Sequence, residues 1–238
     1  MRYAILSDIH SNWEALETAI DYLSKEQIEE YWVLGDSVGY GANPNECFRW
    51  VWEKAKVALL GNHEQAVTDF KLRDWFTGDA RRAIEWTAEV LKAEYKEKIS
   101  NLNFLHVTPS VTAAHGSPDQ PEKYRYLFSF EDARSSFKAF ETSLCFVGHT
   151  HVPSVFTESS ESASYLSAGS YRLKKEDRYI LNPGSVGQPR DQDSRLAFAI
   201  FDDQTWTFEL VRLRYDNQKA ARKIQEAGLP PFLAARLL

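Results

Sequence analysis

The chain of 238 residues has little cysteine, a deficit of basic residues and no long hydrophobic run. Its two cysteines, Cys47 and Cys145, stand far apart and outside any CxxC pair, which argues against a disulfide framework and a thiolate zinc site. No segment approaches the ~18 apolar residues of a membrane-spanning helix. The first residues, MRYAILSD, lack the apolar core and cleavage site of a secretory signal. We therefore expect a cytoplasmic protein with no membrane partner.

Acidic residues outnumber basic ones, with 34 Asp and Glu against 28 Lys and Arg and a formal net charge of −6. Sequence-independent binding to long nucleic acid needs a basic face, so this balance argues against such a partner. A small anionic substrate is not excluded, because bound metal cations would reverse the local sign of the charge.

Apolar segments in the first half of the chain each run into a polar loop, as buried strands do: residues 2–6, 31–36 and 56–60. Helices are expected between them. One would begin at a capping box of Ser11 and Glu14, and the next at Asn43 and Pro44. Strands that alternate with helices predict a parallel sheet, whose sites form at the carboxyl ends of the strands.

The second half is rich in strands and poor in helices. The candidate strands are 104–107, 111–114, 144–148, 152–156, 163–166, 178–181, 196–201 and 205–211. Helices are expected over 79–98, about 130–139 and 216–226, and residues 157–175 are expected to form a hairpin or a mobile loop. This pattern predicts a second sheet, mixed or antiparallel, packed on the first. No linker composition divides the chain, so we expect a single domain over 1–238.

Histidines concentrate in short polar motifs at the expected strand ends. Five of the six lie in SDIH, GNHE, AHGS and GHTH, and only His106 lies outside, where we expect a structural strand residue. Each motif alone is weak, although His149 and His151 are stronger because residues i and i+2 of a strand point the same way. The ordered conjunction of all five motifs, including the GD of residues 35–36, indicates a site for Mn, Fe, Co, Ni or Zn.

The set SDIHSN, GDSVGYG, GNHE, HG and GHTH resembles the calcineurin-like metallophosphoesterase superfamily, from residue 1 to about 210. The later NPGSVGQPRD, residues 182–191, is similar to its compact single-domain prokaryotic branch of phosphodiesterase-like members. The resemblance implies an α/β fold, a four-layer αββα sandwich of two mixed β-sheets flanked by helices.

The resemblance also implies two divalent metal ions, with manganese the one expected to serve best in vitro. Asp36 would bridge the ions, and His63 would be the general acid. The other ligands would form two sets, Asp8, His10 and His151 for one ion and Asn62, His115 and His149 for the other. A hydroxide between the ions would attack phosphorus in line while His63 protonates the leaving alkoxide.

The second motif departs from the GDxVDRG typical of the protein Ser/Thr phosphatases in this superfamily. Gly39 and Tyr40 stand where those enzymes have Asp and Arg, so the phosphate-clamping arginine of that position is absent. Arg190 is either a substitute for it or an ion-pair partner of Asp191 or Asp193.

Substrate contacts are expected from Asn12, Tyr40 and Arg190, although Asn12 also suits helix capping. The tryptophans, Trp75 among them, are expected mostly in core or interlayer packing. Specificity would come from loops of the chain, 37–46, 64–78, 117–128 and 157–175. The tail, 229–238, would either support a homo-oligomer or cap the sheet.

These features together predict a hydrolase of a phosphodiester or phosphoanhydride bond in a small phosphorylated molecule, such as a nucleotide or dinucleotide. The first alternative is a phosphomonoesterase or protein phosphatase. A non-enzymatic metal-binding scaffold is less expected, since all eight motif positions are intact.

Overall fold

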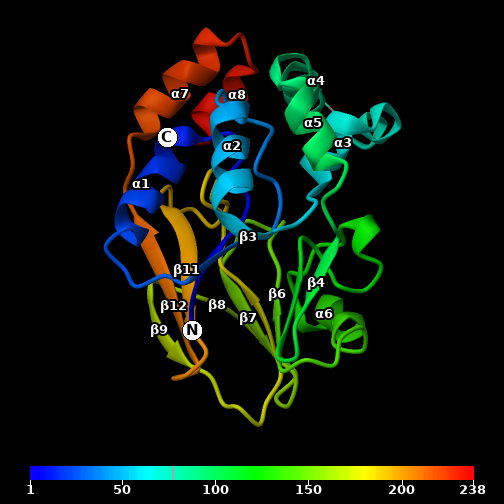
Figure 1. Ribbon diagram of the computed structural model, residues 1–238, viewed down its shortest axis with the longest axis vertical. Coiled ribbons are helices and arrows are strands. Elements are labelled where there is room, and N and C mark those ends of the chain that lie inside the picture. Colours follow the sequence, from blue (N-terminus) through cyan, green and yellow to red (C-terminus); the bar gives the residue numbers. More distant parts are fainter. Residues whose placement is uncertain (77) are drawn as a thin grey trace.

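The computed structural model describes residues 1–76 and 78–238, and within them two six-stranded sheets form the centre of the molecule (Figure 1). The first sheet has the order β3-β2-β1-β11-β12-β9. Its strands are β1 Arg2–Leu6, β2 Glu30–Val33, β3 Ala55–Ala58, β9 Gly169–Arg172, β11 Leu196–Asp202 and β12 Thr207–Leu213. The three N-terminal strands are parallel, as the alternation of strands and helices predicts.

The other half of the first sheet differs from the expectation. Strand β11 pairs antiparallel with β1, β12 with β11, and β9 with β12, so these strands do not belong to the second sheet. Strand β9 lies in the segment 157–175, which was expected to form a hairpin or a mobile loop, and it pairs with β12 of the first sheet and not with β8. Its sequence, GSYR, is mostly exposed at the sheet edge and therefore lacks an apolar pattern.

The second sheet is mixed, as expected, with the order β4-β5-β6-β10-β7-β8. Its strands are β4 Leu105–Val107, β5 Val111–Ala114, β6 Leu144–Phe146, β7 Ser154–Thr157, β8 Ser162–Tyr165 and β10 Tyr179–Asn182. Strands β5, β6 and β10 are parallel neighbours, and the remaining pairs are antiparallel. The carboxyl ends of β5 and β6 therefore point the same way.

Apolar side chains fill the space between the sheets. Ile5 and Phe201 of the first sheet and Phe146 of the second belong to one buried cluster, in which the Phe146 and Phe201 rings lie 5.6 Å apart. Helices α1, Trp13–Leu23, and α2, Pro44–Lys54, pack on the outer face of the first sheet. Helix α6, Phe130–Ser136, packs on the outer face of the second. The predicted αββα layering is confirmed.

The remaining helices gather at one end of the sheets, apart from a short turn, η2 Pro121–Lys123 (Figure 1). They are α3 Asn62–Thr68, η1 Phe70–Trp75, α4 Gly78–Val90, α5 Ala93–Ile99, α7 Asn217–Glu226 and α8 Pro231–Ala235. The helix expected over 79–98 is two helices, because Lys92 takes an extended conformation at the start of α5. Among the described residues, no helix is long and apolar enough to cross a membrane.

Candidate metal centre

The side chains of the predicted metal site converge from loops at strand ends in both sheets. Each of the seven carboxylate and imidazole groups among them exposes 6% or less of its surface. The positions are Asp8 and His10 after β1, Asp36 after β2, Asn62 and His63 after β3, His115 after β5, and His149 and His151 after β6. The packing of one sheet on the other therefore brings together residues that lie up to 143 positions apart.

The loops that carry these residues have unusual backbone geometry. Asp8, His10, Asp36, His149 and His151 all have φ between 49° and 67°, the left-handed region that non-glycine residues seldom occupy. Backbone hydrogen bonds over 3.1 Å and 2.8 Å, from Asp8 N to the Gly35 carbonyl and from His10 N to the Asp36 carbonyl, hold the first two loops together. Such conformations persist only where the surroundings impose them, and they concentrate at functional sites.

The expectation that His149 and His151 share one face of a strand is wrong. Strand β6 ends at Phe146, and both histidines lie in the left-handed loop beyond it. The two imidazoles consequently diverge. His149 lies beside His115, with its Nδ1 3.2 Å from that residue's Nε2, whereas His151 lies beside His10, with 3.1 Å between the two Nε2 atoms.

The first cluster consists of Asp8, His10 and His151. The Nδ1 atoms of the two imidazoles lie against backbone carbonyls, 3.2 Å from Val38 O for His10 and 2.6 Å from Gln188 O for His151. A carbonyl only accepts, so both Nδ1 atoms carry hydrogen, and in the neutral form that a metal ligand needs each ring has its lone pair on Nε2. These lone pairs face one another, and the Asp8 Oδ1 lies 3.3 Å from Nε2 of His151.

The second cluster consists of Asp36, His115 and His149, with Asn62 beside it. The Nδ1 of His115 lies 3.0 Å from the Leu34 carbonyl, so the neutral ring again has its lone pair on Nε2. That Nε2 lies 3.2 Å from Asp36 Oδ2 and 3.1 Å from Asn62 Oδ1. Three acceptors therefore meet at one point.

Both clusters fit divalent cations. Lone pairs of nitrogen and oxygen that converge in a buried site repel one another unless a cation lies between them. In addition, the buried Asp8 Oδ1 has no hydrogen-bond partner among the described residues. The backbone carbonyls on the opposite ring nitrogens are the partners that orient metal-binding histidines. Asp36 lies within reach of both clusters, with Oδ2 3.7 Å from His10 Nε2 and 3.2 Å from His115 Nε2.

Burial and the two carboxylates set the protonation of the imidazoles. Burial lowers the pKa of His149 to about 3 and that of His63 to about 4, so both are neutral at pH 7. Burial also lowers the pKa of His115, but the adjacent Asp36 carboxylate outweighs it and raises that pKa to about 9. Without a metal, a proton on His115 Nε2 therefore satisfies the acceptors of the second cluster at pH 7, and a bound cation would take its place.

Glu64, the last residue of GNHE, has a role that the sequence reasoning missed. Its buried carboxylate accepts hydrogen bonds from the backbone N–H groups of Asp36 at 2.8 Å, Ser37 at 2.5 Å and Val38 at 3.2 Å. It also accepts from Gly61 N at 3.2 Å, three residues before it. Glu64 thus holds the Asp36 loop to the start of α3. The available signal was a glutamate three residues after a helix-capping position.

A pocket of about 360 Å³ opens over the clusters. The described residues that line it include the predicted contacts Tyr40 and Arg190, and loops 37–46, 64–78 and 117–128 all contribute. Segment 157–175 contributes none of these lining residues, since it forms β8 and β9. Trp75 does line the pocket and is 68% exposed, so its expected place in the core is wrong. His106 is a strand residue of β4, as expected, and packs against Trp32.

Arg190 and Asn12 each had two expected roles. Asp191 pairs with Arg212, and Asp193 with Arg195, so neither pairs with Arg190, which instead lines the pocket.

The structure assigns Asn12 the capping role. Its Oδ1 accepts from Ala15 N at 3.2 Å, and its Nδ2 donates to Gly187 O at 2.8 Å. Asn12 does not line the pocket over the clusters. The expected cap at Ser11 is wrong, because Asn12 stands at the helix boundary.

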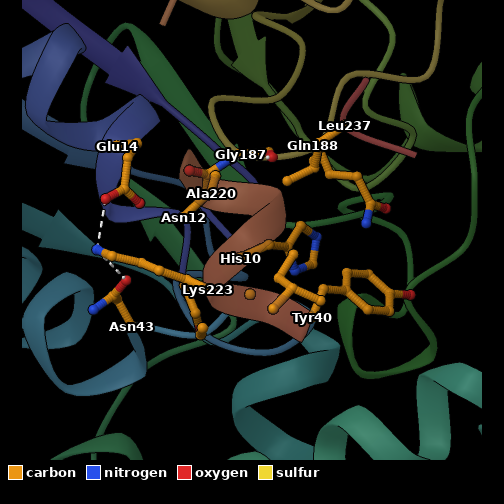
Figure 2. Close-up of a pocket in the computed structure, with 14 residues that line it drawn as sticks. His10, Asn12, Glu14, Tyr40, Asn43, Gly187, Gln188, Ala220, Lys223 and Leu237 are labelled. Carbon is orange, nitrogen blue, oxygen red and sulfur yellow. Dashed lines mark hydrogen bonds and ion pairs between the residues drawn. The ribbon is translucent and has the colours of Figure 1, made fainter. Parts of the chain in front are cut away.

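A second hollow lies on the other side of His10 and Tyr40, under α7 (Figure 2). Its floor holds an ion pair between Glu14 and Lys223, and Lys223 also donates to Asn43 Oδ1 at 3.0 Å. The hollow measures about 10 Å³, which suffices for about one water molecule and no substrate.

Comparison with known proteins agrees with this geometry. A family model, the calcineurin-like phosphoesterase superfamily domain, matches residues 1–205. The chain belongs to this superfamily. As a calcineurin-like phosphoesterase it is a metallophosphoesterase with buried His/Asp clusters, which are consistent with a dimetal site.

Relatives of this calcineurin-like phosphoesterase come from bacteria and archaea. An uncharacterized protein of Methanocaldococcus jannaschii is 38% identical, over 98% of this chain and 96% of its own. A metallophosphoesterase from Sphaerobacter thermophilus is 35% identical with a TM-score of 0.90, over 100% of this chain and 98% of its own. A hypothetical protein from Pyrococcus horikoshii OT3, 20% identical over 99% and 97%, shares the fold with a TM-score of 0.79.

Proposed function

We propose that this metallophosphoesterase hydrolyses a phosphodiester or phosphoanhydride bond of a small molecule. The observation that carries the proposal is the pair of buried clusters, which have Asp36 within reach of both and open onto a pocket of about 360 Å³. That volume lies near the lower end of the roughly 300–1,000 Å³ typical of small-ligand sites.

The ligand sets proposed for the two ions follow the two clusters. Asp8, His10 and His151 would hold one ion, and Asn62, His115 and His149 the other, with Asp36 shared. When bound, two such cations neutralise charge on phosphate oxygens and lower the pKa of water. Manganese is the ion that we expect to support activity best in vitro.

His63 is the proposed proton donor. It lines the pocket, and its Nε2 lies 4.0 Å from Asp36 Oδ2. Its backbone N donates to Asp36 Oδ1 at 2.9 Å, which fixes the residue beside the shared carboxylate. Burial holds its pKa at about 4, but an anionic substrate phosphate close by would raise that pKa and favour the protonated ring. The imidazole would then deliver its proton to the leaving oxygen.

Arg190 is the proposed phosphate clamp. Its guanidinium donates to Gln188 Oε1 at 3.1 Å and lies 5.9 Å from the Tyr40 ring at the pocket. Arg190 thus supplies, from a different part of the chain, the positive charge that the motif GDSVGYG lacks. The pocket is of a size that suits a small molecule, and the motif GDSVGYG lacks the arginine typical of the protein phosphatases. Both features favour a small substrate over a phosphoprotein.

A substrate and metal panel tests the proposal. Metal-free protein would be supplied in turn with Mn, Ni, Co, Fe and Zn and assayed on bis-p-nitrophenyl phosphate, p-nitrophenyl phosphate and diadenosine tetraphosphate. We expect turnover of the diester or the dinucleotide above that of the monoester. Asp36→Asn and His63→Gln should each lower kcat, by about 100-fold or more for the loss of the proton donor.

Two results would contradict the proposal. A clear preference for the monoester would favour a phosphomonoesterase instead. Turnover that neither substitution changes would mean that the assigned residues do not perform the chemistry, while cooperative melting of the metal-free variants would show that both are folded.

A further inference from the structure

Aromatic side chains dominate one part of the pocket over the clusters. Tyr40, Trp75, Phe76, Tyr124 and Tyr126 line it, and we refer to these five as the aromatic wall. They come from three separate segments: the loop after β2, the end of η1 and the residue after it, and the loop that follows β5. Only Tyr40 figured among the predicted substrate contacts, so this concentration emerges from the fold.

The aromatic wall begins at the imidazoles of the site. The Tyr126 ring stacks on His149 with 3.9 Å between centroids and 18° between planes. The Phe76 and Tyr40 rings meet His63 edge-on, at 5.1 Å and 4.4 Å. A substrate whose phosphate is held at the clusters would therefore have these aromatic rings next to the group that its phosphate carries.

The outer members of the wall are exposed to solvent. Trp75 is 68% exposed and Tyr126 is 46% exposed. Large apolar groups left uncovered at the mouth of a polar pocket mark a binding surface more often than a defect of packing. Trp52 gives a contrast. It is 43% exposed but is not among the described residues that line the pocket, and it stacks on Phe48 beneath the Lys98 ammonium.

Cationic groups accompany the wall. Lys123 and Arg190 line the same pocket, and Arg190 Nε is buried without a hydrogen-bond partner among the described residues. Cations and metal-binding clusters suit phosphate, whereas the aromatic wall suits a flat ring system. A nucleotide carries both in one molecule.

We propose that the aromatic wall binds the nucleobase of a nucleotide substrate by stacking, while Arg190 and the clusters take its phosphate. The inference rests on the proposed phosphoesterase function and names the substrate class of that site. A single phenol ring, as in a phosphotyrosine side chain, would fill less of a cavity of about 360 Å³ and would leave Trp75 at its mouth uncovered.

The test is a comparison of ligands that differ in one group. Binding of adenosine 5′-monophosphate, ribose 5-phosphate and phenyl phosphate to the manganese-loaded full chain would be measured by titration calorimetry, with hydrolysis of diadenosine tetraphosphate and bis-p-nitrophenyl phosphate assayed in parallel. Base–aromatic stacking predicts that adenosine 5′-monophosphate binds about ten-fold or more tightly than ribose 5-phosphate.

Trp75→Leu should remove about ten-fold of the affinity for adenosine 5′-monophosphate and leave ribose 5-phosphate unaffected. Because Trp75 is mostly exposed, this change should not unfold the protein. Trp52→Leu is the matched control, an exposed tryptophan removed elsewhere, and should change neither affinity.

Equal affinity for the nucleotide and the sugar phosphate would overturn the inference, and so would phenyl phosphate binding as tightly as the nucleotide. An equal effect of Trp75→Leu on all ligands, or none, would also overturn it. Selective nucleotide binding without hydrolysis of diadenosine tetraphosphate or bis-p-nitrophenyl phosphate would overturn the proposed function alone, which keeps the two failures apart.

Discussion

Gly39 shows how closely a single residue can control the candidate acid. Its φ is +86°, and a Cβ at this position would overlap His63 Nδ1. The glycine that replaces the acidic residue of GDxVDRG thus leaves room for the imidazole. Any side chain here would force the His63 ring out of its present position.

Gly39→Ala should therefore lower kcat by about 100-fold, the scale of a lost general acid. The strained backbone should also cost about 1–3 kcal/mol of unfolding free energy. Gly228→Ala is the matched control, since Gly228 has φ +70° but no atom within 4 Å of the added Cβ. Gly228→Ala should lower the free energy of unfolding but leave kcat unchanged. Full activity in Gly39→Ala would mean that His63 is not the proton donor.

Individual residues also show what local sequence can and cannot predict. Asp8 and His115 could be assigned to a site because strand ends and polar motifs are local features of the chain. The exposure of Trp75 depends on how η1 packs, and no local pattern encodes that. Glu64 was overlooked because its partners, the backbone groups of Asp36 to Val38, lie 26 to 28 positions away.

At the scale of elements, α8 is where the C-terminal tail meets the rest of the chain. Leu233 is 2% exposed and packs with Ala220 and Ile224 of α7. Tyr40 packs against the same cluster, so α7 and α8 support the loop that carries a pocket residue. The tail thus covers helices of its own chain and not the sheet itself, while a role in a homo-oligomer stays a prediction.

Leu233→Ala should lower the free energy of unfolding by about 2–5 kcal/mol, because it leaves a cavity in this cluster. Its neighbour Phe232 is 53% exposed, and Phe232→Ala should change stability by no more than about 0.5 kcal/mol. Urea unfolding of the two variants measures the difference. Equal effects would mean that α8 is not docked as described.

Elements were predictable where their apolar pattern is strong. Strands β1 and β3 and helix α2 follow from buried runs and from Pro44 at the first turn. The break in the helix over 79–98 was not predictable, since Leu91 continues the apolar pattern while Lys92 departs from helical geometry. Strand β9 escaped prediction because it is an exposed edge strand.

At the scale of the whole molecule, the partners of the strands could not be predicted from periodicity. Strand β11 is apolar along nearly its whole length, a pattern that either sheet could bury. Its antiparallel pairing with β1 depends on long-range contacts that no local pattern contains. The resemblance implied the correct layers, but the pairing that joins the two halves of the chain becomes visible only in the fold.

The two sheets meet at the metal centre. Asp8 and Asp36 come from the first sheet, and His115 and His149 come from the second. Without cations, the facing nitrogen lone pairs of His10 and His151 and the carboxylates of Asp8 and Asp36 are crowded in a buried junction. Cation binding should therefore stabilise the native state as a whole rather than one loop.

Addition of Mn²⁺ to metal-free protein should raise its melting temperature. Saturation at 100 times the dissociation constant stabilises by about 2.7 kcal/mol for each ion. For a chain of this size, each kcal/mol corresponds to about 2–4 °C, so two ions should give a shift on the order of 10 °C or more.

Asp36→Asn should remove most of the shift, because it alters the carboxylate that lies near both clusters. Ser159→Ala, at an exposed hydroxyl paired with Asp177, should keep it. If manganese does not raise the melting temperature of the wild type, the clusters do not bind this metal, and that conclusion does not depend on any substrate.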